Sequence, residues 1–354
     1  MTTPMEYVLS TPTPETATFS IAVEGSPITF RCAGDDVLLR AALRAGVGLF
    51  YECNVGSCGS CRVELVHGEV HDLRPGAPGL TARDLRRGNR LLACQTQPRS
   101  DCVIRARPQA GPELRPRRFS AELQTALPIT DELREFRFRG PAPATFEPGQ
   151  YALLTLPGVA GVRAYSLCNR SNEEGEWHFL VKRVPGGSAT AYLFDRLQVG
   201  DIIELDGPYG GATLRETAER DVVCLAGGSG LAPMLAIALA VAGTPLGEQV
   251  RMHFYHGART PEELRAGDLV TGLDGFGERH RYVPVVSDPD AAAAAGWPGA
   301  VGHLHEALVR DLAPRFGELE FYLAGPPPMI TATLNLLVLE HRVPVERIHY
   351  DRFF

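Results

Sequence analysis

The spacing of four cysteines constrains this chain more than any other feature. Cys53, Cys58 and Cys61 form the pattern C-x4-C-x2-C, and Cys94 follows further along the chain. This is a spacing with which four thiolates hold a 2Fe-2S cluster, two on each iron. Glycines and serines lie between the first three, so the backbone can fold tightly and bring its N–H groups to the sulfurs. The alternative is a zinc site, which more often uses two C-x2-C knuckles.

The remaining cysteines, Cys32, Cys102, Cys168 and Cys224, lie in or beside segments expected to be strands, so we predict buried, unreactive thiols. No basic residue precedes Arg31, which argues against an export signal. The longest apolar run is too short to span a bilayer. We therefore expect a cytoplasmic protein without a membrane-spanning segment, in a compartment that keeps thiols reduced.

A length of 354 residues predicts two or three domains. The net charge of −7 and the absence of a basic block exclude nucleic acid as an expected partner. The proline-rich and charged stretch 107–118 is predicted to be a linker, and the composition changes again near Asp221. The predicted domains are 17–108, 118–215 and 219–354, with a linker at 109–117.

Hydrophobic patterns assign a fold class to each domain. The first predicts a hairpin across Gly25 and a helix over Asp35–Arg44 capped by Asp35. The second contains short β-prone runs that fit an antiparallel barrel. The third alternates apolar strands with helices, as a doubly wound α/β domain requires. The expected strands are Thr18–Val23, Ile28–Cys32, Tyr151–Leu156, Trp177–Val184, Ile202–Leu205, Val222–Ala226, Val250–Tyr255, Tyr282–Val286 and Glu320–Leu323.

Two motifs in the second domain suggest a flavin. The tetrapeptide Arg163–Ser166 has the form R-x-Y-S and follows P-G-Q-Y at 148–151. An arginine can neutralise a pyrophosphate, a tyrosine ring can lie on the flavin, and a hydroxyl can bond its edge. The second motif, V-P-G-G-S-A-T at 184–190, offers backbone N–H groups at a helix start, with Thr190 as helix cap and phosphate ligand.

The third domain opens with a strand followed by G-G-S-G-L-A-P-M at 227–234. Backbone N–H groups at the start of the next helix would receive a dinucleotide phosphate. Arg259 follows the second strand, where the adenosine ribose is expected, and the neighbouring Glu262 and Glu263 favour NADH over NADPH. The chain ends in D-R-F-F, and the last aromatic rings are predicted to cover the flavin ring.

These motifs resemble those of known redox domains. The segment with YECNVGSCGSCRVEL and LLACQ resembles a plant-type ferredoxin, which implies a β-grasp fold. The R-x-Y-S box and the 227–234 motif, with A-G-P-P-P-M at 324–329, resemble the ferredoxin-NADP reductase superfamily, which implies a six-stranded FAD barrel and an NAD domain. That family usually has cysteine where Ala324 stands, which leaves the efficiency of hydride transfer open.

The order of the three domains resembles the reductase component of bacterial multicomponent oxygenases, most closely those of toluene 4-monooxygenase systems. The resemblance implies electron flow from NADH to FAD, to the 2Fe-2S cluster, and then to a Rieske-type ferredoxin or the hydroxylase of an aromatic diiron monooxygenase. The protein would act as a monomer. Alternatives are the reductase of a Rieske aromatic dioxygenase, a pure electron carrier, and a zinc-stabilised dehydrogenase, for which no catalytic acid or base is placed.

The residues implied for these roles are as follows. The expected cluster ligands are Cys53, Cys58, Cys61 and Cys94; the cofactor-binding residues are Arg163, Ala164, Tyr165, Ser166, Lys182, Val184, Gly186, Gly187, Ser188, Thr190, Gly227, Gly228, Ser229, Gly230, Arg259, Gly325, Pro326, Phe353 and Phe354. Tyr165, Ser166 and Phe354 would act at the flavin ring. The loop Asn54–Ser60, with Glu52 and Arg62 beside it, is the predicted exposed docking surface for the partner.

Overall fold

The computed structural model describes residues 17–215 and 220–354 and divides into two compact units. One unit consists of residues up to Leu49 together with Cys61–Gly111, and the other consists of Phe50–Ser60 together with Pro112–Phe354. The loop with Cys53 and Cys58 therefore groups with the C-terminal part of the chain, whereas Cys61 and Cys94 belong to the N-terminal unit.

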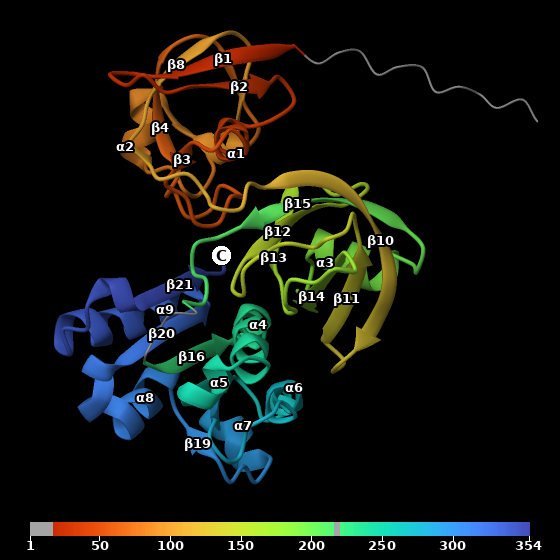
Figure 1. Ribbon diagram of the computed structural model, residues 1–354, viewed down its shortest axis with the longest axis vertical. Helices are drawn as coiled ribbons and strands as arrows, with labels where there is room; N and C mark the ends of the chain where they lie inside the picture. Colours follow the sequence, from red (N-terminus) through yellow and green to blue (C-terminus); the bar gives the residue numbers. More distant parts are fainter. Residues whose placement is uncertain (1–16, 216–219) are drawn as a thin grey trace, which may run out of the picture. The chain divides into compact units, whose positions relative to one another are not determined.

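The N-terminal unit is a mixed five-stranded sheet with the order β2-β1-β8-β4-β6, as a β-grasp domain requires (Figure 1). Strands β1 and β8 pair in parallel, and the other neighbours are antiparallel. Helix α1 supplies the core residues Leu38, Leu39 and Leu43. The elements are β1 (Thr18–Val23), β2 (Thr29–Ala33), α1 (Leu38–Arg44), β3 (Gly48–Leu49), β4 (Arg62–His67), β5 (Val70–Asp72), α2 (Ala82–Arg87), β6 (Arg90–Leu92), β7 (Thr96–Pro98), β8 (Cys102–Arg105) and β9 (Pro108–Gln109).

The start of α1 differs from the prediction. Its N-terminal flanking residue is Val37, and no side chain caps the helix. The carboxylate of Asp36 instead accepts a hydrogen bond from the Val37 N–H at 2.8 Å and pairs with Arg44. The prediction of Asp35 as the cap is therefore wrong, because the helix begins further along the chain.

The second unit contains an antiparallel sheet with the order β13-β12-β15-β10-β11-β14. A bridge between Leu167 and Phe179 joins the two outer strands, so the sheet closes into the predicted barrel. Trp177 and Phe179 fill its interior. The elements are β10 (Arg117–Pro128), β11 (Leu133–Arg139), β12 (Tyr151–Thr155), β13 (Val162–Ser166), β14 (Glu176–Lys182), α3 (Ser188–Asp195) and β15 (Ile202–Tyr209).

The rest of this unit is a parallel sheet with the order β19-β18-β17-β16-β20-β21. The strand order reverses between β16 and β20, which is the switch point where doubly wound folds bind ligands. The elements are β16 (Asp221–Gly227), α4 (Leu231–Ala242), α5 (Leu246–Gln249), β17 (Met252–Ala258), α6 (Asp268–Thr271), β18 (Arg281–Val286), α7 (Pro289–Ala294), β19 (Ala300–Val301), α8 (Leu304–Leu312), β20 (Leu319–Gly325), α9 (Pro327–Leu334) and β21 (Ile348–Arg352). Short 3₁₀ turns cover Ala93–Gln95, Gly228–Gly230, Glu263–Gly267, Ala313–Glu318 and Val345–Arg347, and a π turn covers Asn335–Glu340.

The described helices are short. None of them is both long enough and apolar enough to cross a bilayer. The four cysteines outside the spaced set are buried, as predicted. Burial raises the pKa of Cys32 to about 12 and raises those of Cys168 and Cys224 further, so these thiols stay protonated.

Candidate functional site

A cavity of about 230 Å³ lies beside strand β13 of the barrel. All four residues of the R-x-Y-S motif line it, together with Lys182 from β14, Ser229 from the 227–234 motif and the chain end Asp351–Phe354. Burial raises the pKa of Tyr165 to about 12, so its hydroxyl remains a hydrogen-bond donor. Segments predicted separately from the sequence therefore meet at one cavity.

The loop between β14 and α3 carries the second predicted flavin motif. Gly187 is the N-terminal flanking residue of α3, and no side chain caps the helix. The Thr190 hydroxyl accepts a hydrogen bond from the Val184 N–H at 3.1 Å, so it ties the loop to the helix from inside. The prediction that Thr190 caps the helix is wrong. Gly186 adopts a φ of +71° with no atom within 4 Å of where a Cβ would stand, which leaves its backbone open to a ligand.

The glycines at the end of β16 pack against the end of β20. A Cβ on Gly230 would lie 2.0 Å from the carbonyl oxygen of Ala324, and one on Gly227 would lie 2.5 Å from the Met329 sulfur. Gly228, with φ +55°, has open space around it. The glycines at 227 and 230 thus allow the close approach of strand and helix, while Gly228 leaves room for a dinucleotide.

A second cavity, of about 570 Å³, lies at this switch point. It is lined by Gly227, Gly228, Arg259 and Pro326, which were predicted to bind cofactor, and by the unpredicted His303. Gly325 ends β20 with φ +153°, and its carbonyl oxygen accepts a hydrogen bond from the Phe353 N–H at 3.0 Å. This bond holds the chain end at the carboxyl edge of the sheet.

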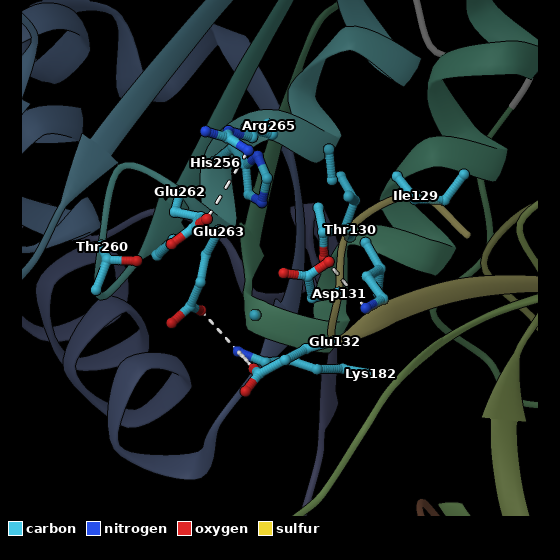
Figure 2. Close-up of a pocket in the computed structure, with 15 residues that line it drawn as sticks. Ile129, Thr130, Asp131, Glu132, Lys182, His256, Thr260, Glu262, Glu263 and Arg265 are labelled. Atoms are coloured by element: carbon cyan, nitrogen blue, oxygen red, sulfur yellow. Dashed lines mark hydrogen bonds and ion pairs between the residues drawn. The ribbon is translucent and has the colours of Figure 1, made fainter. Parts of the chain in front are cut away.

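A third cavity, of about 450 Å³, separates the β10–β11 turn from the segment after β17 (Figure 2). The Lys182 Nζ lies 2.7 Å from a Glu263 carboxylate oxygen and 3.8 Å from one of Glu132. Lys182 lines all three cavities. Glu262, also taken from sequence as a sign of NADH, is largely exposed and lies 3.8 Å from Arg265.

His256 lines the third cavity from the floor of β17. Its Nδ1 lies 2.8 Å from the Tyr282 hydroxyl, and burial lowers its pKa to about 4. The imidazole is therefore neutral at physiological pH. We therefore assign His256 a structural role, in which it supports the wall of this cavity.

The loop with Cys53 and Cys58 is fixed to the barrel. The Tyr151 hydroxyl donates to the Glu52 carbonyl oxygen at 2.6 Å, and the Tyr51 hydroxyl accepts from the Gly210 N–H at 3.0 Å. The Arg352 guanidinium lies 3.6 Å from the Glu52 carboxylate. Cys53 consequently lines the same cavity as Tyr165.

This packing corrects one prediction. Every residue of Asn54–Ser60 is buried or half-buried, so this loop is not the exposed docking surface expected from the sequence. Sequence reasoning also missed Glu52, Tyr151 and Arg352 as a connected set. The only signal available was a pair of charged residues directly before the terminal phenylalanines.

The four spaced cysteines form two pairs, one in each unit. The Cys58 N–H donates to the Cys53 sulfur at 3.4 Å, and the sulfurs of Cys61 and Cys94 lie 3.3 Å apart. Hydrogen bonds from Cys53, and from Ser60, lower the pKa of Cys58 to about 4, so this pair holds a thiolate. Among the described residues no group of three or more ligand side chains converges as a metal site. The donor chemistry of each pair, two adjacent sulfurs with N–H donors, fits one iron of a two-iron cluster.

A closed barrel, a switch-point crevice and a cysteine loop fixed at the cavity rim define the class of iron-sulfur flavoprotein reductases. Matches to family models follow the same order along the chain. Residues 21–99 match a 2Fe-2S iron-sulfur cluster binding domain, residues 120–213 an oxidoreductase FAD-binding domain, and residues 224–335 an oxidoreductase NAD-binding domain.

The chain belongs to the family of reductase components of multicomponent oxygenases. It is 40% identical over 328 residues to the ferredoxin–NAD(+) reductase component of the alkene monooxygenase system of Xanthobacter autotrophicus, covering 92% of this chain and 98% of that one. It is 32% identical over 344 residues to the phenol 2-monooxygenase reductase component of Pseudomonas sp., covering 95% and 94%. A solved structure of the ferredoxin reductase in carbazole 1,9a-dioxygenase matches with a TM-score of 0.85 at 36% identity, covering 96% and 99%.

The predicted fold and cofactors are confirmed by these matches. The protein is an oxidoreductase that uses NADH, FAD and a 2Fe-2S cluster, with electrons passing in that order. It hands electrons to a ferredoxin or oxygenase partner.

Proposed function

We propose that the cavity beside β13 holds the flavin ring and that Cys53 receives electrons from it. The observation that carries this proposal is that Cys53 and Tyr165 line one cavity. Electron transfer falls steeply with distance, so a cluster ligand at the rim of the flavin cavity gives a short path from flavin to cluster. When bound, the flavin accepts two electrons together and releases them one at a time, which matches nicotinamide to a cluster.

The chain's own residues have separate proposed roles. Arg163 neutralises pyrophosphate, Tyr165 lies against the ring, and Ser166 bonds its edge. Phe354, which is 62% exposed, covers the outer face until nicotinamide displaces it. The glycine-rich loops at 186–188 and 227–230 and the residues Arg259, Gly325 and Pro326 receive the phosphates and ribose of the two dinucleotides.

We further propose the pairing of ligands and the class of acceptor. Cys53 and Cys58 hold one iron, and Cys61 and Cys94 hold the other. The acceptor is a Rieske-type ferredoxin, or the hydroxylase, of an aromatic diiron monooxygenase; the relative named for phenol 2-monooxygenase supports an aromatic substrate, and the one named for an alkene monooxygenase system supports a monooxygenase. The carbazole dioxygenase likeness supports the second candidate, a Rieske dioxygenase system. The protein acts in the cytoplasm as a monomer, with domains at 17–108, 118–215 and 219–354 joined by the linker 109–117.

An anaerobic NADH titration of the purified holoprotein tests the proposal. Flavin bleaching is followed optically and the cluster by electron paramagnetic resonance. We expect the flavin to bleach and a rhombic reduced 2Fe-2S signal to appear in the same titration. Loss of that signal in Cys53→Ser with flavin bleaching retained supports the ligand role, whereas an unchanged cluster signal in this variant overturns it.

A further inference from the structure

Helix α2 lies at the periphery of the N-terminal unit (Figure 1), and all of its residues except the half-buried Asp84 are exposed. None of its residues is buried, and the Leu85 side chain is 51% exposed. The helix is held by local devices: Thr81 and Asp84 form a capping box, and Gly88 ends the helix with φ +74°. Core packing therefore does not dictate the side chains on its outer face.

The outer face is strongly basic. Residues 73–90 contain five arginines and one acidic residue, in a chain whose net charge is −7. Arg83, Arg86 and Arg87 are exposed, and none of their side chains makes a hydrogen bond or ion pair with another described residue. The single acid, Asp84, is occupied, because it accepts from Thr81 and lies 3.5 Å from Arg62.

Helix stability accounts for only part of this charge. Arginines in the last turn interact favourably with the helix dipole, which accounts for Arg86 and Arg87. Arg83 lies in the first turn, where the dipole disfavours a cation. The half-exposed Leu85 lies between arginines whose side chains are unpaired, and an apolar residue ringed by cations suits the binding of an acidic protein.

The helix is attached to strands β4 and β6, which lie next in the chain to two of the proposed cluster ligands. Arg62, the ion-pair partner of Asp84, directly follows Cys61, and the Cys61 carbonyl oxygen accepts from the Ala93 N–H at 3.0 Å. Strand β6 follows α2 and leads to Cys94, whose sulfur lies 3.3 Å from that of Cys61. The basic face thus belongs to the part of the unit that holds the second cysteine pair.

We propose that the outer face of α2, comprising Arg83, Leu85, Arg86 and Arg87, docks a one-electron acceptor protein that presents a carboxylate-rich face. This inference rests on the proposed function, and it replaces the loop Asn54–Ser60, whose residues are buried or half-buried, as the docking surface. In the docked complex one electron passes from the reduced cluster to the redox centre of the acceptor. No bond forms or breaks.

The test uses holoprotein and a triple charge-reversal variant, R83E/R86E/R87E. The matched control is R196E/R251E/R342E, which changes the net charge equally at three other exposed arginines, whose guanidinium groups make no hydrogen bond or ion pair among the described residues. The acceptors are an acidic Rieske-type ferredoxin, cationic cytochrome c and ferricyanide. Binding of the oxidised ferredoxin is measured by titration calorimetry, and its NADH-driven reduction is measured at low and high salt.

We expect the α2 variant, but not the control, to bind and reduce the acidic ferredoxin about tenfold less well at low salt, with the difference shrinking at high salt. Reduction of cytochrome c is expected to stay equal or rise, reduction of the trianion ferricyanide to fall no more than in the control, and the NADH-dependent cluster signal to stay unchanged. A milder variant, R83Q/R86Q/R87Q, should lie between wild type and reversal. Its cluster signal checks that the unit is intact.

Each failure has its own signature. If the wild-type protein neither binds nor reduces the acidic ferredoxin while its cluster is reduced by NADH, the proposed acceptor class is wrong. If wild type reduces the ferredoxin and the α2 variant does so equally well at low salt, the docking surface is wrong. Equal losses in the α2 variant and the control also overturn the assignment, because they show an effect of overall charge.

Discussion

The hydroxyl of Tyr151, on the first residue of barrel strand β12, donates a hydrogen bond of 2.6 Å to the carbonyl oxygen of Glu52, the residue before Cys53. A barrel residue therefore positions the backbone of a proposed cluster ligand. Tyr151 belongs to the P-G-Q-Y sequence that introduces the flavin motif, so one short segment contributes both to the cavity and to the cysteine loop at its rim.

Replacing Tyr151 by phenylalanine removes this hydrogen bond and keeps the ring. We expect flavin bleaching by NADH to be unchanged within about twofold, and the appearance of the reduced cluster to slow by about tenfold, because small misplacements of reacting groups are costly. Stopped-flow absorbance separates the two steps. Tyr255→Phe is the control, since its hydroxyl bonds Asp311 at 3.3 Å elsewhere in the fold. Equal slowing of both steps in Tyr151→Phe would contradict a positioning role.

Lys182 and Glu263 give a prediction in which two variants act in opposite directions. Lys182→Met removes the cation that lines all three cavities. KM for NADH should therefore rise by about tenfold, which corresponds to the loss of one charge-assisted hydrogen bond. Glu263→Gln releases Lys182 from its 2.7 Å ion pair, so KM should fall or stay equal. Steady-state reduction of ferricyanide measures both. A rise in KM in both variants would show that the ion pair itself shapes the site.

Gly230 tests the close packing at the switch point. A Cβ there would lie 2.0 Å from the Ala324 carbonyl oxygen, so Gly230→Ala must push the strand and helix apart. We expect a loss of about 1–3 kcal/mol in the free energy of unfolding and weaker NADH binding. Gly211→Ala is the control, because no atom lies within 4 Å of its Cβ position and its φ is ordinary. Urea unfolding and an NADH titration check the pair, and equal stabilities would refute the packing argument.

His256 makes the stability of the protein depend on pH. Its pKa is lowered by burial to about 4, below the unfolded value of 6.5, so the unfolded chain binds more protons between these limits. The contribution of His256 to the free energy of unfolding is fully present above about pH 6.5. It is lost progressively as the pH falls towards 4. Relative to pH 8, the loss at pH 5 should be about 2 kcal/mol.

The comparison variant is His256→Gln, which should be less sensitive to acid. Unfolding in urea at pH 8 and pH 5 measures the free-energy difference for both proteins. We expect the difference between the two pH values to be smaller in the variant by about 2 kcal/mol. An identical pH dependence would mean that His256 titrates normally in the fold.

Local motifs were predictable from sequence because each performs its role within a few residues. The R-x-Y-S box and the glycines at 227–230 are local motifs, and the four central strands of the parallel sheet, β18, β17, β16 and β20, follow from hydrophobic periodicity. Strand β10 was not identified, although Phe119, Ala121 and Leu123 alternate inward along it, because alanine gives a weak hydrophobic signal. Strand β21, which directly precedes the terminal aromatic residues, was not identified from the sequence either.

Contacts between distant segments were not predictable in the same way. Glu52 and Arg352 are far apart in the sequence, and neither segment contains a pattern that indicates their contact. Asp35 and Thr190 looked like helix caps, but a cap depends on where the helix begins, and helix ends are fixed by tertiary packing. The loop Asn54–Ser60 was expected at the surface near one edge of the cluster, yet its residues are buried or half-buried, and the residues before it, Tyr51 and Glu52, bond to the barrel.

Lys182 is the only lysine of the chain and lines each of the three cavities. Reductive methylation with labelled formaldehyde would therefore mark this side chain and the α-amino group alone, while keeping the positive charge. The resulting nuclear magnetic resonance spectrum would contain one resonance from the centre of the cofactor region. Binding of nucleotide would be visible as a shift of that single line, without any engineered reporter.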